Sequence, residues 1–296
     1  MRVVVFGAGS LGSLIGGLLA SEHDVTLIGR EPHVSAVQKQ GLEITGEIAT
    51  RTHPHAATTV PDAADLALVT VKSYDTPEAA QALAAADPAV VLSLQNGLGN
   101  EDVLAGTLDG TVLAGTCTYG ARLLEPGVVR CTGAGTVTVG SRAGGPSDAV
   151  ERVGSAFERA GLATTVATDM PRRLWEKLAI NAGINAITAL ARVENGALRD
   201  GPASETATRA TREAARVARE NGLDLGDDHA IDAFETVVET TAPNRSSMYQ
   251  DLEAGRRTEI DAINGVVVEL ASDPVPVNET LTALLRAWER ERQLRG

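Results

Sequence analysis

The 296-residue sequence has few lysines, few aromatic residues and only two cysteines, and these shortages exclude several classes of protein. Three of its 26 basic residues are lysines, and 39 acidic residues bring the formal net charge to −13. A surface of this charge repels phosphate backbones and anionic lipids, so we expect neither a nucleic-acid nor a membrane partner. Cys117 and Cys131 lack any paired spacing, which predicts packed thiols and neither a disulfide framework nor a metal site.

Long apolar runs are absent as well. No stretch approaches the roughly 20 apolar residues that a membrane helix needs, and no basic segment precedes an apolar one as in a secretory signal. We therefore expect a cytoplasmic protein. The length and the 43% apolar content leave room for two domains, each with its own core.

The N-terminus contains the pattern of a strand, a glycine turn and a helix. Residues 2–6 (RVVVF) are typical of a buried parallel strand, and GAGSLG at 7–12 leads into a helical segment. In such a turn Gly7 permits the reversal, Gly9 lets a pyrophosphate approach the backbone, and Gly12 lets the helix pack on the strand. The pattern predicts a dinucleotide site, and the alternative is a close turn that binds nothing.

The end of the second predicted strand, 24–28, bears on the choice of cofactor. Arg30 stands where an NAD site usually has an acidic residue, and a guanidinium suits the 2′-phosphate of NADP. Glu31 is adjacent and is an alternative partner for the ribose hydroxyls. We expect NADPH.

Strands and helices alternate to about residue 168, and the remainder has helical patterns only. We expect an α/β Rossmann domain over 1–168, with a doubly wound, mostly parallel sheet, and an all-α domain over 169–296. Ligands of such sheets bind beyond the carboxyl ends of the strands, so the cleft between the domains is the expected site. The further predicted strands are 64–72, 89–97, 111–121, 128–133, 136–141 and 163–169, and the further predicted helices are 76–86, 172–191, 204–221, 229–241, 246–272 and 278–295.

Two polar residues end predicted strands of this sheet. Lys72 ends the apolar run 64–72, and Asn96 lies in Gln-Asn-Gly at the end of 89–97. The simplest explanation for Asn96 is turn chemistry. Because both groups end strands at the edge where the cofactor is expected, we favour a functional role.

A stripe of polar residues crosses the predicted helix 172–191. Lys177, Asn181 and Asn185 are spaced four apart on an otherwise apolar segment. A buried carboxamide without a partner costs on the order of 2–7 kcal/mol, so the stripe predicts a polar ligand opposite it, with Lys177 as a candidate proton donor. The alternative is an exposed first turn, with the asparagines bonded to neighbouring loops. For Glu259 the pattern favours an ion pair with Arg256 on a solvated helix face.

Taken together, these motifs resemble the ketopantoate reductase (2-dehydropantoate 2-reductase) family over essentially the whole chain. The order and spacing of several segments carry the resemblance, and the run around Lys177 and the last segment are the most specific of them. The segments are GAGSLG, Gly29-Arg30, TVKS around Lys72, LQNGLG around Asn96, LWEKLAINAGINAITAL, ENG at 194–196, NRSSM at 244–248 and RRTEIDAING at 256–265.

The resemblance implies an NADPH-dependent reduction of 2-dehydropantoate, a small 2-keto acid, to (R)-pantoate on the route to pantothenate and coenzyme A. It implies that Lys177 donates the proton and that Glu259 lies beside the cofactor and the reacting group, which replaces the ion-pair interpretation of Glu259. By the same resemblance, the cofactor would be bound by Gly7, Ala8, Gly9, Ser10, Leu11, Gly12, Arg30, Lys72, Asn96, Ala121 and Glu259. The substrate would be bound by Asn96, Lys177, Asn181, Asn185, Asn195 and Ser247.

Two other functions compete with this one. The first is an NADP-dependent reductase of another 2-keto acid, with the same lysine and a differently shaped pocket. The second is a non-catalytic NADPH-binding sensor, which the presence of Lys177, Asn181 and Glu259 disfavours. A homodimer stays open, because the sequence does not fix the oligomeric state.

Overall fold

A computed structural model describes residues 1–295, which divide into two compact units. The first unit comprises residues 1–95 and 99–170, and the second comprises residues 96–98 and those from 171 onward. The sequence had predicted a boundary between 168 and 169 with no excursion at 96–98. The short segment that carries Asn96 therefore belongs with the helical unit.

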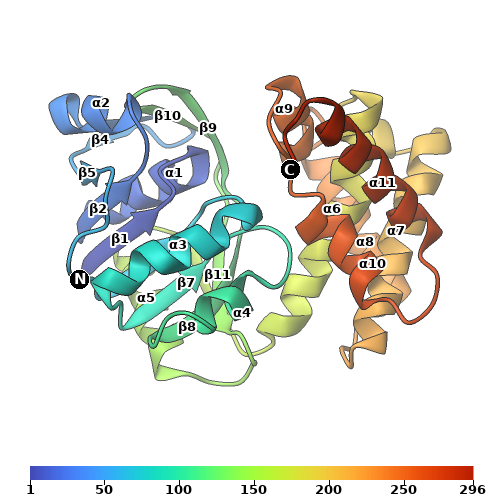
Figure 1. Ribbon diagram of the computed structural model, residues 1–296, viewed down its shortest axis with the longest axis horizontal. Helices are drawn as coiled ribbons and strands as arrows, with labels where there is room; N and C mark the ends of the chain where they lie inside the picture. Colours follow the sequence, from blue (N-terminus) through green and yellow to red (C-terminus); the bar gives the residue numbers. More distant parts are fainter. Residues whose placement is uncertain (296) are drawn as a thin grey trace. The chain divides into compact units, whose positions relative to one another are not determined.

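The first unit is built on an eight-stranded, mostly parallel sheet (Figure 1). Neighbouring strands are parallel except β8 and β11, which pair antiparallel. The predicted Rossmann-type α/β fold with a mostly parallel sheet is thus confirmed. In sheet order, the strands are β12 (Thr164–Ala167), β11 (Val137–Ser141), β8 (Thr111–Cys117), β7 (Val90–Ser93), β6 (Leu66–Val69), β1 (Arg2–Phe6), β2 (Asp24–Ile28) and β5 (His55–Ala57).

Both faces of this sheet are covered, which explains why its central strands are apolar without alternation. In β1, Val3 and Val5 join one core cluster and Val4 joins another on the opposite face. Helices contributing to the first cluster are α1 (Ser10–Leu19), α2 (His33–Gln40) and α5 (Asp148–Arg159). Those contributing to the second are α3 (Thr76–Leu83) and α4 (Asn100–Ala105), and Figure 1 shows α3 lying across the strands.

A second, four-stranded sheet was not predicted. Its order is β4 (Thr50–Thr52), β3 (Leu42–Gly46), β10 (Val128–Gly133) and β9 (Gly120–Glu125). The expectation of one continuous strand over 111–121 is therefore wrong, because β8 ends at Cys117 and β9 begins in the other sheet. Helix α1 lies between the sheets: a Cβ on Gly16 would approach Leu27 of β2 to 2.5 Å, and one on Gly17 would approach Leu42 of β3 to 2.6 Å.

The second unit is helical, as predicted. Helix α6 packs closely on its neighbours because Gly183 has no side chain: a Cβ there would lie 2.3 Å from Thr211 Oγ1 and 3.1 Å from Phe234. The helices of the second unit are α6 (Met170–Ala191), α7 (Gly201–Glu220), α8 (Asp227–Thr240), α9 (Ser247–Glu253), α10 (Val266–Leu270) and α11 (Pro276–Glu291).

The single helix predicted over 246–272 is wrong, because the chain breaks twice there. Gly255 adopts a left-handed φ of +64° after α9, and the N–H of Arg256 donates to the carbonyl of Asp251 (2.8 Å), which closes the helix as a glycine C-cap does. Irregular backbone follows, and then a π-helix, η4 (Asp261–Gly265), runs into α10. This interruption creates the segment that carries Glu259.

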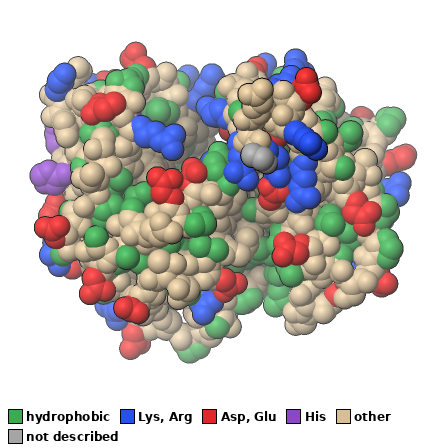
Figure 2. Space-filling model, in the orientation of Figure 1, with side chains coloured by type: hydrophobic (Ala, Val, Ile, Leu, Met, Phe, Trp, Pro, Cys, Tyr) green, Lys and Arg blue, Asp and Glu red, His purple; other side chains and the backbone are tan. Residues whose placement is uncertain are grey.

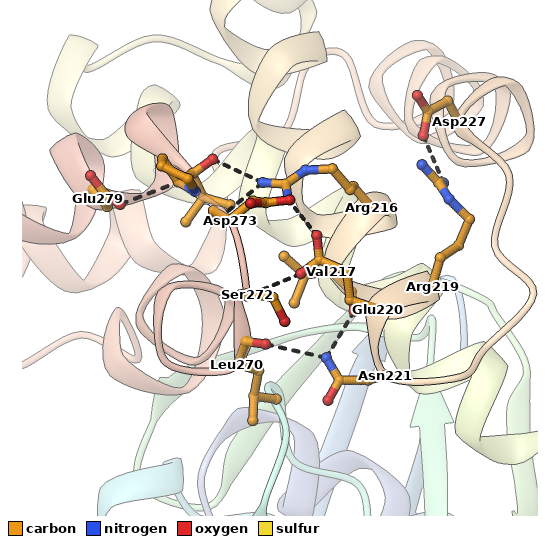
Figure 3. A network of polar contacts seen from close by, with 12 residues as sticks. Arg216, Val217, Arg219, Glu220, Asn221, Asp227, Leu270, Ser272, Asp273 and Glu279 are labelled. Atoms are coloured by element: carbon orange, nitrogen blue, oxygen red, sulfur yellow. Dashed lines mark hydrogen bonds and ion pairs between the residues drawn. The ribbon is translucent and has the colours of Figure 1, made fainter.

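A polar network fixes the loop between α10 and α11 (Figure 3). Arg216 of α7 donates to the carbonyls of Asp273 (3.3 Å) and Pro274 (2.8 Å), and Glu220 accepts from the backbone N–H of Ser272 (2.9 Å). Asn221 donates to the carbonyl of Leu270 (3.3 Å). Helix α11 therefore starts from an anchored position.

In Figure 2, acidic side chains are scattered over the visible face, whereas several basic side chains gather in its upper middle. Within residues 1–295, no helix has the length and apolarity that crossing a bilayer requires.

Candidate active site

The glycine turn between β1 and α1 has the geometry that its sequence predicts. Gly7 adopts a φ of +111°, and the N–H groups of Gly7 and Ala8 donate to the carbonyl of Ile28 at the end of β2 (3.0 and 2.8 Å). A Cβ on Gly12 would lie 2.2 Å from Gly7 O and 2.5 Å from Thr70 Oγ1. The fold itself therefore requires glycine at positions 7 and 12.

Gly9 differs from the other two glycines. A Cβ built there would meet only Gly7 O, at 4.0 Å, so the protein leaves the space beside Gly9 open. This space lies at the N-terminus of α1, where helix N–H groups lack intrahelical acceptors and favour an anion. The turn therefore fits a dinucleotide phosphate.

Strand β9 borders the same helix end. Ser10 Oγ accepts a hydrogen bond from the backbone N–H of Leu123 (3.0 Å), and Leu11, Ala121 and Leu123 pack against one core cluster. The structure thus brings Ala121 close to the start of α1. The unpredicted second sheet explains this placement.

Arg30 follows β2 directly and is exposed. Among residues 1–295, no carboxylate forms an ion pair with it. Glu31, the alternative ribose ligand, accepts a hydrogen bond from the backbone N–H of Ser35 (3.2 Å). The Glu31 carboxylate is thus bonded to the start of α2, and the neighbouring Arg30 guanidinium is available for a 2′-phosphate.

Lys72 is half-buried, three residues after the end of β6, where it precedes a short 3₁₀ turn, η1 (Ser73–Asp75). The Gln95 side chain donates to the carbonyl of Val71 (3.1 Å) and to Thr76 Oγ1 (2.7 Å). The bond to Val71 fixes the backbone directly before Lys72, and the bond to Thr76 holds the first residue of α3. Gln95 was not singled out in the sequence, although it stands in the same Gln-Asn-Gly turn as Asn96.

The predicted polar stripe lies on α6 in the second unit. Lys177 and Asn181 are half-buried, and Asn185 is 6% exposed. Within the described chain, no side chain or backbone group hydrogen-bonds the carboxamides of Asn181 and Asn185. These two amides therefore have the donors and acceptors free that a polar ligand needs.

Glu259 is buried, with 4% of its surface exposed, so the expectation of an ion pair on a solvated helix face is wrong. Its Oε2 accepts a hydrogen bond from Asn96 Nδ2 (3.3 Å), and Arg256 pairs with Asp251 (3.1 Å). Asn264 Nδ2 donates to the carbonyl of Ala182 in α6 (3.1 Å). The segment with Glu259 is thereby anchored beside the polar stripe of α6.

A groove of the second unit is lined by sequence neighbours of Asn195 and Ser247 but not by these two residues themselves. Asn195 is buried, its Nδ2 donates to Thr241 Oγ1 (2.9 Å), and its Oδ1 has no partner among the described residues. Ser247 is exposed at the first turn of α9, whose N-cap is Ser246. The groove has a volume of about 760 Å³, and the residues lining it include Arg192, Glu194, Gly196, Arg199, Arg245 and Tyr249.

Ser246, the residue before Ser247, was not singled out in the sequence. Its Oγ accepts from the backbone N–H of Tyr249 (3.1 Å) and from Thr188 Oγ1 of α6 (2.8 Å). Ser246 is thus the N-cap of α9, and its buried hydroxyl faces α6. The Ser246–Thr188 bond holds the start of α9 against the helix that carries Lys177.

Known proteins resemble this chain over most of its length. Residues 3–144 match the family described as ketopantoate reductase PanE/ApbA, and residues 169–289 match its C-terminal part. A 2-dehydropantoate 2-reductase from Halobacterium salinarum is 46% identical, and the alignment covers 98% of this chain and 100% of that protein.

Solved structures resemble the chain over its full length. A PanE/ApbA family ketopantoate reductase from Ralstonia eutropha has a TM-score of 0.90 at 34% identity, covering 99% of this chain and 100% of the other. A ternary structure of D-mandelate dehydrogenase with NADH and anilino(oxo)acetate has a TM-score of 0.92 at 25% identity, with both chains covered completely. From its sequence, its fold and these matches, the chain belongs to the ketopantoate reductase family.

Proposed function

We propose that the protein reduces 2-dehydropantoate to (R)-pantoate with NADPH. The observation that carries this proposal is the pair of carboxamides of Asn181 and Asn185 on the helix of Lys177, which are half-buried and buried and have no hydrogen-bond partner among residues 1–295. Relatives named 2-dehydropantoate 2-reductase, at 46% and 40% identity over 98% of this chain, support the substrate.

The first unit would hold the cofactor. The N-terminus of α1 and the open space beside Gly9 would receive the diphosphate, and Arg30 would pair with the 2′-phosphate. Lys72, Asn96, Ala121 and Glu259 would flank the bound cofactor, as the family resemblance implies. When bound, NADPH supplies a hydride to the keto carbon of the substrate.

The second unit would supply the acid and the substrate contacts. Lys177 would donate a proton from Nζ to the carbonyl oxygen as negative charge develops there, and its ammonium would stabilise that charge. The carboxamides of Asn181, Asn185 and Asn195, with the Ser247 hydroxyl, would hold the carboxylate and hydroxyl of the substrate. Glu259 would orient the reacting group together with Asn96, to which it is hydrogen-bonded.

A reductase of another 2-keto acid is the second candidate, and a specific observation favours it. D-mandelate dehydrogenase, whose structure contains NADH and anilino(oxo)acetate, matches the whole fold as closely as the ketopantoate reductases do. A protein with this fold thus carries the name of a different dehydrogenase and is seen with NADH.

Initial rates of cofactor oxidation with a panel of 2-keto acids test the proposal. We expect the highest kcat/KM with 2-dehydropantoate and NADPH, and a lower value with NADH. A preference for an aromatic or unbranched 2-keto acid would support the second candidate. NADPH binding without turnover of any acid would support a sensor.

The cytoplasmic location and the oligomeric state belong to the same proposal. Cell fractionation tests the location. Light scattering of the purified protein tests whether it forms a homodimer.

A further inference from the structure

Glu259 lies in backbone that neither a helix nor a sheet holds in place. Irregular structure extends from the end of α9 to η4, and Thr258 directly precedes Glu259. The carbonyl of Glu259 accepts from the N–H groups of Ala262 and Ile263 (both 3.1 Å), which fixes only its C-terminal side. Its N-terminal side needs another anchor.

That anchor is Glu289 of α11. The Glu289 side chain is fully buried, and its Oε1 accepts hydrogen bonds from both the backbone N–H (2.7 Å) and the hydroxyl (2.5 Å) of Thr258. Thr258 Oγ1 also accepts from the backbone N–H of Ile260 (3.2 Å). One carboxylate oxygen thus determines the backbone on the N-terminal side of Glu259.

The charge of Glu289 is balanced by the last described residue. Arg295 donates to Glu289 Oε2 and to Asp261 Oδ2, and Arg286 pairs with Asp261 Oδ1 (2.7 Å). Burial would raise the pKa of Asp261, but the hydrogen bonds from Arg286 and Arg295 outweigh it and lower that pKa. The network therefore ties both sides of Glu259 to α11 and to the end of the chain.

We propose that Glu289 is a positioning residue that acts through Thr258 to hold the Glu259 carboxylate in its reactive place. The inference rests on the proposed function of Glu259. A buried carboxylate costs several kcal/mol of desolvation unless hydrogen bonds and an ion pair compensate it. Glu289 directs Oε1 at Thr258 and pairs Oε2 with Arg295. A displacement of about 1 Å at a reacting group can lower the rate about a hundredfold.

Replacement of Glu289 itself would leave Arg295 and Thr258 unpaired, and that variant can fail to fold. Thr258→Val is the sharper change, because it removes one hydroxyl and keeps the side-chain shape. Thr258→Ser is its conservative partner. Thr211→Val is the matched control, since that buried hydroxyl donates within α7 to the carbonyl of Ala207 (3.0 Å).

We expect Thr258→Val to lower kcat at least about tenfold, Thr258→Ser to restore it to within about threefold of wild type, and Thr211→Val to leave it unchanged. The same Thr258→Val change in a Glu259→Gln background should cost less than about twofold, because the effect passes through Glu259. Equal losses in both backgrounds, or a kcat of Thr258→Val equal to that of Thr211→Val, would overturn the proposal.

Hydrogen exchange separates this inference from the proposed function. Amides 258–265 should exchange faster in Thr258→Val than in wild type and in Thr211→Val, and unchanged exchange would overturn the positioning role. If the wild type reduces no 2-keto acid while these amides still loosen, the proposed reaction fails and the Glu289 anchor stands.

Discussion

Arg30 is the residue at which the choice between NADPH and NADH is proposed to be made. It lies exposed after β2, and the only carboxylate next to it in sequence is bonded to the backbone N–H of Ser35. A guanidinium contact to a phosphate contributes more than a neutral hydrogen bond, because both partners are charged.

Replacement of Arg30 by alanine should therefore weaken NADPH selectively. We expect the KM for NADPH to rise about tenfold or more, with little change in the KM for NADH, since a charge-assisted contact contributes about 1.5–3 kcal/mol. Steady-state rates with each cofactor measure this. Arg159→Ala on α5 is the control, and equal changes for both cofactors would contradict the assignment.

His33 connects three elements of the first unit and is buried. Its Nδ1 accepts from the backbone N–H of Gly127 (3.0 Å), so in the neutral ring Nε2 carries the proton and donates to Ser13 Oγ (3.0 Å). Burial lowers the pKa of His33 below its ordinary value of 6.5. As the pH falls, His33 is therefore protonated more readily in the unfolded chain than in the native state.

This difference in the pKa of His33 between the native and unfolded states makes the free energy of unfolding depend on pH. The contribution of neutral His33 to the free energy of unfolding is complete above about pH 6.5 and is lost as the pH falls from there towards the lowered native pKa. The drop in melting temperature between about pH 7.5 and 5.5 should be smaller in His33→Gln than in wild type. Exposed His53 supplies the control variant His53→Gln, and an undiminished drop in His33→Gln would rule out this role.

Single residues also show where prediction from the sequence reaches its limit. The i, i+4 spacing was enough to place Lys177, Asn181 and Asn185 together, because a helix repeats locally. The burial of Glu259 was not predictable from local pattern, since its surroundings come from Asn96 and from Glu289, 163 and 30 positions away in the chain. Only the family resemblance pointed to it.

At the scale of elements, the glycine turn separates folding from cofactor binding. A Cβ on Gly12 would overlap Gly7 O and Thr70 Oγ1, so this position is needed for folding. A Cβ on Gly9 would meet only Gly7 O, at 4.0 Å, so this position has room for a ligand. The two positions should therefore respond differently to the same added methyl group.

Gly9→Ala should raise the dissociation constant of NADPH about tenfold or more and leave the melting temperature within a few degrees of wild type. Gly12→Ala should lower the melting temperature, because its Cβ overlaps the backbone of the turn. Fluorescence titration and thermal unfolding measure the two effects. Normal NADPH affinity in Gly9→Ala would show that no phosphate approaches this residue.

The elements also differ in how far the sequence determines them. The residues of β1 and β2 were predicted as observed, because both strands are short apolar runs bounded by turn residues. The small sheet was missed, since the paired residues of β3 and β10 are 85 positions apart in the chain, a parallel contact that no local pattern encodes. The break after α9 has a local signal, Gly255, which the helical pattern around it obscured.

At the scale of the whole molecule, the proposed cofactor contacts and the proposed proton donor lie mostly in two different units with separate cores. The glycine turn and Arg30 belong to the first unit, whereas Lys177 and the asparagines of α6 belong to the second. The sequence indicated both fold classes from the change in periodicity near residue 170. A catalytic change in the second unit should therefore leave most of the cofactor contacts intact.

The most direct test of the account is the effect of Lys177→Ala on two quantities, kcat for 2-dehydropantoate reduction and the dissociation constant of NADPH. We predict that kcat falls at least about a hundredfold and that NADPH affinity stays within about threefold of wild type, with Lys39→Ala, an exposed lysine of α2, matching wild type in both. Turnover in Lys177→Ala close to that of the wild type would contradict the assignment of Lys177 as the proton donor.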